Sequence, residues 1–552
     1  MITKAFSRHS TFILASFLIF TYSCANIQNP SGGPKDTVPP KLINANPQNQ
    51  QIEFKGAKII LTFNKLVKII NPQKEIIVTP EMSIPPVFRD KKKSIIMDIS
   101  RESLRPNTTY SINFGKSISD LTEGNLAEPY KYVFSTGSSI DSLSLSGKIN
   151  YSIDSTEIKN VFVGIYDIKS ANIVKDNPLW FTYTNDKGEF EFTNLSEGTY
   201  RLYTFTNNDQ SRRFNYKKLL AFLSDDINLN KNITGLNLVL SKQIPDSIKI
   251  ENKEFKSPKI CLTLNYIVDP GDIEYKAIES ESKREISLVL DTKGPSDTIC
   301  FFPGTIKFSA LEVTVGNKEV HYDKTVIRNF NPDAKPANVD INTNLSGSVL
   351  NDQNLKLFFS APVQSIEKSK IILTENSSPV SNFELKPLNN NKALEFGFIY
   401  NWSKGLTYNI TIPTQGVKSI YGGENLEFKR EFTVENTEDK FGSLKLLLEV
   451  PEGQQYIVYL IDSAKKTESQ KVIDKSSTIE FKNLLPGPYK LLFIHDLNKN
   501  SKWDAAKFTK LIQAEPLALD PVAINVRANW QFEQSYSLKP LAKGSLDQTT
   551  KK

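Results

Sequence analysis

The sequence predicts an all-β protein built from tandem β-sandwich domains. Runs of roughly four to eight residues rich in Ile, Val, Phe, Tyr and Thr recur along the chain, as in Lys58–Phe63 and Tyr456–Leu460. Asn, Gly, Pro, Asp and Ser separate these runs, which is typical of strands joined by turns. Long helical periodicity is absent, and only Trp503–Leu511 predicts a helical turn or two.

Length and composition fit several domains. A chain of 552 residues is long enough for about three to five domains of ordinary size. Hydrophobic residues make up 39% of it, which supports packed cores rather than disorder. The net charge of +7 is too dilute for a nucleic-acid binder. With only three histidines and three cysteines, we expect no enzyme, no cofactor and no metal centre.

Residues 1–23 predict a lipoprotein signal peptide. Basic residues precede the apolar stretch Thr11–Tyr22, whose roughly 18 Å as a helix is too short to span a bilayer core of roughly 30 Å. The stretch ends in Ser23-Cys24, which resembles a lipobox, where cleavage precedes a cysteine that becomes lipidated. The alternative is an ordinary signal followed by a chance cysteine. Residues 24–37, rich in Asn, Pro and Gly, are expected to form a flexible tether.

Internal similarity organises the rest of the chain. Phe190–Leu202 recurs without a gap as Ile479–Leu491, and the segment around Thr109-Tyr110 recurs around Thr407-Tyr408. One two-domain block is therefore present twice. We expect domains at 38–137 and 138–243, a β domain of unassigned type at 244–344, the repeated pair at 345–436 and 437–540, and a polar tail at 541–552.

Both repeated segments resemble known modules. Ile59-Ile-Leu-Thr-Phe-Asn64, Leu104-Arg-Pro-Asn-Thr-Thr-Tyr110 and Tyr132-Val-Phe-Ser-Thr136 make residues 38–137 similar to the bacterial Ig-like domain first named for S-layer proteins, the SbsA type. Thr184–Leu202 resembles the prealbumin-like module of carboxypeptidase regulatory domains. The opening Cys24–Pro40 is similar to the start of Ig-like-domain lipoproteins of the Bacteroidota. Residues 244–344 match neither module.

The repeated signature has a structural interpretation. Gly188, Gly198 and Gly487 are expected to supply turns, because glycine accepts a positive φ without a side-chain clash. Large residues at alternate positions, such as Phe190 and Phe192, are expected to face one sandwich core.

Two cysteines remain once Cys24 is assigned to lipid. Cys261 and Cys300 lie in strand-like apolar contexts. In an oxidising compartment such a pair can form a disulfide that stabilises by about 3 to 4 kcal/mol. Two buried free thiols are the alternative, and the sequence leaves both open.

The segment after His495 is the most tempting ligand site. Its oxygen-bearing residues alternate as in the first half of a calcium loop, and the candidate ligands are Asp496, Asn498, Asn500 and Asp504. Ser501 stands where that loop needs glycine, and Lys507 where it needs a bidentate glutamate. A polar turn bonded to its own backbone is therefore favoured.

Other candidate binding residues are basic or aromatic. The clusters Asp90–Lys93 and Arg212–Lys218 are expected to be solvated loops or lysine-protected edges, although the aromatics in the second would suit a glycan or an acidic partner. Trp180, Trp402 and Trp530 are candidate platforms for sugar stacking, with burial in a core favoured.

Six short patterns resemble the O-glycosylation sequon of the Bacteroidota, namely Asp followed by Ser or Thr and then a further small or apolar residue. The hydroxyl residues concerned are Thr37, Ser142, Ser155, Ser247, Thr298 and Ser463.

These features predict a non-catalytic outer-membrane lipoprotein, anchored by lipid, whose Ig-like domains bind protein partners in the cell envelope. A β-barrel complex for assembly or export is one such partner. A surface glycan-binding or adhesive lipoprotein is the alternative, and an enzyme hidden in 244–344 is weakest. No acidic cluster follows Cys24, so a periplasmic-facing orientation is slightly favoured over the cell surface.

Overall fold

The computed structural model describes residues 35–99, 104–150, 160–170, 172–207, 211–292, 294–317, 320–345, 348–350, 355–388, 394–435, 440–462, 467–520, 522–540 and 550–551. The regular secondary structure of these residues is almost entirely β-strand, so the prediction of an all-β protein is confirmed. No helix within these ranges has the length and apolar character needed to cross a membrane.

The chain divides into two compact units. One comprises Met1–Val78 and Met82–Ser138, and the other comprises Thr79–Glu81 and Ser139–Lys552. We call the ranges 38–137, 138–243, 244–344, 345–436 and 437–540 modules 1 to 5. Module 1 corresponds to the first unit, and modules 2 to 5 belong to the second.

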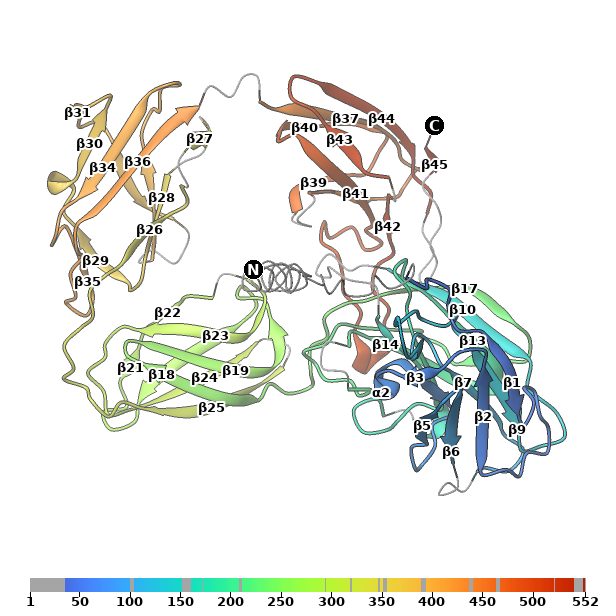
Figure 1. Ribbon diagram of the computed structural model, residues 1–552. Coiled ribbons are helices and arrows are strands. Elements are labelled where there is room, and N and C mark those ends of the chain that lie inside the picture. Colours follow the sequence, from blue (N-terminus) through green and yellow to red (C-terminus); the bar gives the residue numbers. More distant parts are fainter. Residues whose placement is uncertain are drawn as a thin grey trace, which may run out of the picture. The chain divides into compact units, whose positions relative to one another are not determined.

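Module 1 is a β-sandwich (Figure 1). Alternation along the second strand directs Ile59, Leu61 and Phe63 into the core, where none is more than 2% exposed. Its sheets are β1 (Leu42–Asn46), β2 (Lys58–Phe63), β6 (Ser94–Asp98) and β5 (Val87–Lys91) in that order; β3 (Val67–Ile69) with β8 (Ile118–Asp120); and β4 (Ile77–Thr79), β7 (Thr109–Asn113) and β9 (Lys131–Ser135), with helix α2 (Pro72–Glu75).

Module 4 repeats this arrangement strand for strand, with two additional short strands, β27 and β31. Its sheets are β26 (Ile341–Thr343), β28 (Leu355–Phe359), β33 (Glu395–Ile399) and β32 (Glu384–Pro387); β29 (Val363–Ile366) with β35 (Val417–Ser419); and β27 (Ser348–Leu350), β36 (Phe428–Glu435), β34 (Thr407–Ile412), β30 (Ile372–Glu375) and β31 (Ser378–Val380), with the 3₁₀ helix η3 (Lys368–Lys370). Because β26 precedes residue 345, this sandwich begins upstream of the expected boundary.

Modules 2 and 5 share a second architecture. In module 2 the sheets are β13 (Glu189–Leu195), β10 (Leu143–Asn150) and β17 (Ile233–Val239); and β12 (Trp180–Tyr183), β11 (Phe162–Asp167), β14 (Gly198–Phe205), β15 (Leu220–Phe222) and β16 (Ile227–Leu229), with η2 (Ile168–Ser170). In module 5 they are β40 (Ser477–Leu484), β37 (Gly442–Glu449) and β44 (Gln531–Ser537); and β39 (Thr467–Ile473), β38 (Tyr456–Ile461), β41 (Gly487–His495) and β42 (Leu517–Leu519), with β43 (Ile524–Val526) paired to β41 and with η4 (Phe508–Lys510). The short strand β45 (Thr550–Lys551), from the expected tail beyond residue 540, pairs with β44.

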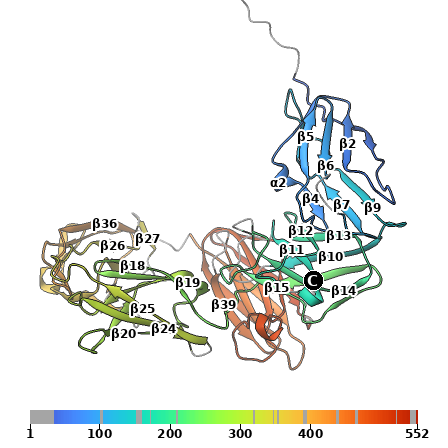
Figure 2. The ribbon, with the colours of Figure 1, turned by 90° about the horizontal axis from the view of Figure 1, so that it is seen from below.

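Module 3 consists of two four-stranded sheets that face each other (Figure 2). One is β18 (Ile250–Lys256), β19 (Lys259–Val268), β23 (Ser296–Pro303) and β22 (Leu288–Leu290), and the other is β21 (Glu285–Ile286), β20 (Glu274–Glu279), β24 (Ala310–Asn317) and β25 (Val320–Arg328). Strand β19 alternates buried and half-buried residues along its whole length, as a strand on one face of a core should.

Tyr110 in module 1 and Tyr408 in module 4 occupy equivalent positions and make equivalent contacts. Tyr110 and Tyr408 lie opposite Phe134 and Phe432 on the neighbouring strand. The ring centroids are 5.1 and 5.6 Å apart, in stacked geometry. Each hydroxyl oxygen accepts a backbone N–H of the preceding loop, at 2.9 and 2.8 Å. The ring therefore fills the core while its oxygen satisfies a loop amide.

The glycine interpretation of the second signature is partly wrong. Gly188 has φ of 77°, as expected, and Gly487 also has a positive φ, of 155°. Near the ends of β13 and β40, just before the next turn, Asn194 and Asn483 are left-handed as well, with φ of 60° and 56°. Gly198 has no positive φ. A Cβ there would lie 2.6 Å from the Tyr200 hydroxyl, so glycine is required for close approach instead.

Candidate functional site

The loop Ser211–Lys218 of module 2 contacts both module 3 and module 5. Phe214 is 2% exposed and packs on Phe205 and Tyr216, with centroids 6.1 and 5.2 Å apart. Lys218 is 4% exposed, and its Nζ donates to Ser211 Oγ at 2.8 Å. The expectation of a solvated basic loop is therefore wrong for Lys218, which is buried, while Arg213 is exposed as expected.

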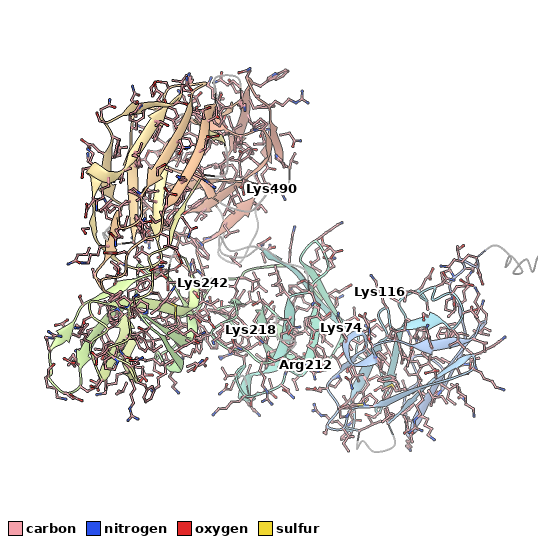
Figure 3. All side chains as sticks on the ribbon, turned by 60° about the vertical axis from the view of Figure 1, so that its left-hand side comes forward. Lys74, Lys116, Arg212, Lys218, Lys242 and Lys490 are labelled. Carbon is pink, nitrogen blue, oxygen red and sulfur yellow. A yellow bond between two sulfur atoms is a disulfide. The ribbon has the colours of Figure 1, made fainter. Side chains whose placement is uncertain are left out.

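The loop Ser211–Lys218 also contacts module 3. Tyr216 packs against the core of module 3, and Lys217 Nζ lies 2.8 Å from a carboxylate oxygen of Glu251 and 2.9 Å from one of Asp297. Desolvation lowers the pKa of Lys217, but its hydrogen bonds to Glu251 and Asp297 outweigh this and raise it. Figure 3 labels Lys218 and Lys242; the latter pairs with Asp269 of module 3 at 3.5 Å.

A loop of module 5, residues 496–516, contacts module 2. It joins β41 to β42 and carries η4 (Figure 1). The Phe508 ring meets Tyr203, Phe214 and Phe222 edge-on, with centroids 5.8, 6.1 and 5.8 Å away. Edge-to-face pairs of this kind contribute about 0.5–1.5 kcal/mol each beyond their buried area.

Three hydrogen bonds reinforce this contact. The backbone N–H of Ala506 donates to Ser241 Oγ at 3.3 Å, and that of Phe508 donates to Gln243 Oε1 at 2.9 Å. Gln513 Nε2 donates to the Phe222 carbonyl at 3.2 Å. Donors and acceptors from segments more than 260 residues apart are thus paired, which fixes the register of module 5 on module 2.

Apolar packing surrounds these bonds. Val239 of module 2 packs against a cluster on module 5 that contains Ile457, Ile494 and Leu517, each no more than 2% exposed. The fit leaves a cavity of about 20 Å³, the space of a single water molecule. We call Ser211–Lys218, Phe508 and the residues they contact across modules the junction.

Residues 496–504 of the module 5 loop form a turn whose side chains hydrogen-bond to its own backbone. Asp496 Oδ2 accepts the Ser501 N–H at 2.7 Å, and Asn500 Oδ1 accepts the Lys502 N–H at 2.8 Å. Asn498 Nδ2 and Asn500 Nδ2 both donate to Asp504 Oδ2. Within the described ranges, no three His, Cys, Asp or Glu side chains are grouped so that they could hold a metal ion.

The buried side chain of Glu515 stabilises this turn through hydrogen bonds to its backbone. Glu515 is 5% exposed and accepts the N–H groups of Leu497 and Asp504, at 2.8 and 3.1 Å. Burial raises the pKa of Glu515, and the nearby Asp496 and Asp504 carboxylates raise it further, against the two N–H donors. Sequence reasoning did not single out Glu515, because it lies eleven residues beyond Asp504.

Cys261 and Cys300 lie directly opposite each other on β19 and β23 and are joined by a disulfide. Trp180 and Trp402 are 8% and 7% exposed and belong to module cores, whereas Trp530 is 57% exposed.

The other residues that the sequence singled out differ in how exposed they are. His495 is buried and its ring stacks on Tyr456, with centroids 4.9 Å apart. Thr37 and Ser142 are exposed, while Ser247 and Thr298 are half-buried. The candidates that lie outside the described residues are Cys24, Ser155 and Ser463.

Known families match one module. The family model described as a bacterial Ig-like domain matches residues 36–136, which agrees with the resemblance of module 1. A comparison with curated proteins returns no match.

Several solved structures of tandem-domain proteins are similar at low identity. The Bacillus anthracis TIE protein is 9% identical, with 92% of this chain and 76% of that chain covered and a TM-score of 0.14. BcpA, the major pilin subunit of Bacillus cereus, is 8% identical, with 72% and 99% covered and a TM-score of 0.14. Surface layer protein SbsC, domains 1–6, is 12% identical, with 88% and 67% covered and the same score. TM-scores of this size carry no argument about function.

Proposed function

We propose that the protein is a non-catalytic outer-membrane lipoprotein, held by lipid on Cys24 and facing the periplasm, whose β modules form a scaffold for protein partners. The observation that carries this proposal is the apolar stretch Thr11–Tyr22 ending in Ser23-Cys24. One acyl chain binds a bilayer only marginally, whereas two or three hold a protein durably.

Tethering supplies the mechanism. An anchor followed by the tether 24–37 confines the modules near the membrane and raises their effective concentration for a resident partner. The partner we favour is a β-barrel complex for assembly or export. A scaffold presents binding faces in a fixed geometry, and the junction supports this role because it holds modules 2, 3 and 5 in register.

The charged side chains of the junction support a structural rather than a catalytic role. Lys217 and Lys218 contact partners within the chain. Outside the junction, the ring of His495 is stacked in a buried position. A nucleophile or general base must be able to reach substrate, and these groups are engaged elsewhere.

Replacing Cys24 with serine tests the anchor. The wild-type protein is expected in the membrane fraction and to incorporate labelled palmitate, whereas Cys24→Ser is expected to lose the label and move to the soluble fraction, because serine offers no thiol for the lipid. Ser23→Ala keeps a small residue before the cysteine and should behave as wild type. A Cys24→Ser protein that stays on the membrane would contradict the proposal.

A surface glycan-binding lipoprotein is the second candidate. Trp530 favours it, since this side chain is 57% exposed and Arg527 lies 5.6 Å from its ring centroid. An exposed indole beside a guanidinium can stack on a sugar and donate hydrogen bonds to it.

A further inference from the structure

The edge where the two sheets of module 3 meet is closed by side chains instead of a backbone ladder. Strands β18 and β25 are the outer strands of separate sheets, and each has a ladder partner on one side only. The Ile250 N–H donates to Asp323 Oδ2 at 2.8 Å, and Lys253 Nζ donates to the Val326 carbonyl at 2.9 Å. Side chains thus replace the ladder bonds that would close the module into a barrel.

Beyond Lys253 the two strands separate and a groove opens. It has a volume of about 690 Å³ and is lined mainly by apolar surface, including Phe255, Val326 and Phe330. That size is ample for several side chains of an extended peptide. Lys253 and Arg328 are its charged lining residues, and no carboxylate lines it.

Phe330 is an aromatic side chain that is exposed to solvent. It is 92% exposed, although burying a phenylalanine is normally favourable by about 1.5–3 kcal/mol. The turn that carries it is anchored, because Asn329 is 8% exposed, donates through Nδ2 to the Ile306 carbonyl and accepts the Asn331 N–H. The ring is therefore presented by a fixed turn at the mouth of the groove.

The backbone of β25 offers hydrogen bonds to the groove. The Asn329 N–H donates to the Ser309 carbonyl, which lies on the side of β24. The Val326 carbonyl instead accepts a hydrogen bond from Lys253 Nζ, which approaches from the opposite side of β25. Since successive residues of a strand alternate in direction, the N–H and C=O groups of Val326 and Arg328 both point away from β24. An added strand would find the Val326 N–H and both backbone groups of Arg328 there, and its own N–H would replace Lys253 Nζ at the Val326 carbonyl.

We infer that this groove binds an extended, acidic segment of a partner protein, which pairs with β25 as an additional strand. Its backbone would bond to Val326 and Arg328, its apolar side chains would lie against Phe255 and Phe330, and its carboxylates would face Lys253 and Arg328. The cationic rim selects an acidic partner over a basic one. The inference deepens the proposed scaffold function by naming the chemistry of its partner.

Fluorescein-labelled peptides of ten residues that alternate valine with aspartate, and matched peptides that alternate valine with lysine, test the inference. Each is titrated against the full chain in detergent, with fluorescence anisotropy as the readout. The aspartate peptide is expected to bind and the lysine peptide to bind at least about tenfold more weakly. Equal binding of both, or of neither, would overturn the inference. It would leave the membrane anchor untouched, because that is tested separately through Cys24.

Two variants distinguish backbone pairing from charge. Val326→Pro removes an N–H that points into the groove and leaves the β24 ladder intact, so aspartate-peptide binding is expected to fall about tenfold or more. Arg328→Glu, which needs no backbone change, leaves one cation and one carboxylate at the rim, so the preference for the aspartate peptide is expected to be lost. Lys276→Glu, an exposed lysine on β20, is the matched control and should change neither affinity.

A second copy of the chain is the competing occupant. If sedimentation shows a dimer that Phe330→Ala abolishes, and the aspartate peptide does not compete with it, the acidic segment is the wrong occupant and the inference is overturned. A monomer that binds the peptide supports it.

Discussion

Replacing Cys261 and Cys300 together with serine is expected to lower the unfolding free energy of module 3 by about 3 to 4 kcal/mol. The two residues are cross-strand neighbours separated by 39 positions, and the bond between them restricts that length of unfolded chain. For a module of this size the melting temperature should fall by more than about 10 °C. Calorimetry of the full chain would show one transition moving while the others stay.

Reduction gives an independent check on the same bond. Dithiothreitol should lower the same transition in the wild-type protein and have no effect on the double serine variant. A variant in which only Cys24 is replaced is the control and should melt as the wild type does. A module 3 transition that does not respond to reductant would contradict a stabilising disulfide.

Replacing Phe508 with alanine is expected to open the junction while leaving each module folded. The ring loses three aromatic neighbours, and for a half-buried phenylalanine we expect a cost of about 2 to 3 kcal/mol at this contact. The amides of Ala506 and Phe508, which donate to module 2, should then exchange with deuterium at least about tenfold faster.

The matched control for this experiment is Trp530→Ala. It removes an aromatic side chain of similar size from the same module, but from an exposed position. It should leave exchange at Ala506 and Phe508 unchanged. If Phe508→Ala also leaves exchange there unchanged, the aromatic contact does not hold the modules together.

Local sequence patterns predicted the fold because each module buries its own alternating strands. Phe190–Leu202 in module 2 and Ile479–Leu491 in module 5 are the repeated segments, and the two modules have the same order of strands in their sheets. The favoured burial was right for Trp180 and Trp402, since both fill cores, and wrong for Trp530, which is 57% exposed. These features depend on residues close in sequence or on one strand face, where a period of two is visible.

The junction could not be predicted in this way. Phe214 and Lys218 lie in a loop with no strand period, and their environment depends partly on Phe508, almost 300 residues away. Basic residues in a loop are usually solvated, and that expectation holds for Arg213 but fails for the buried Lys218. The alternation of Arg, Phe, Tyr and Lys in Arg212–Lys218 was the one available signal that this loop buries more than a surface loop does.

The prediction of a helical turn or two within Trp503–Leu511 is confirmed by the single 3₁₀ turn Phe508–Lys510. Apart from this turn, the segment has no regular helix or strand. Trp503 packs on module 5, whereas Phe508 packs on module 2.

The central claim is that the junction joins modules 2 and 5, and crosslinking tests it most directly. Ser241 Oγ lies 3.3 Å from the Ala506 nitrogen. In a Cys24→Ser background, Ser241→Cys with Ala506→Cys should form a disulfide under mild oxidation, giving a faster band on a non-reducing gel and a linked peptide in the mass spectrum. Either single variant should give neither. A double variant that keeps both thiols free under the same oxidation would contradict the account.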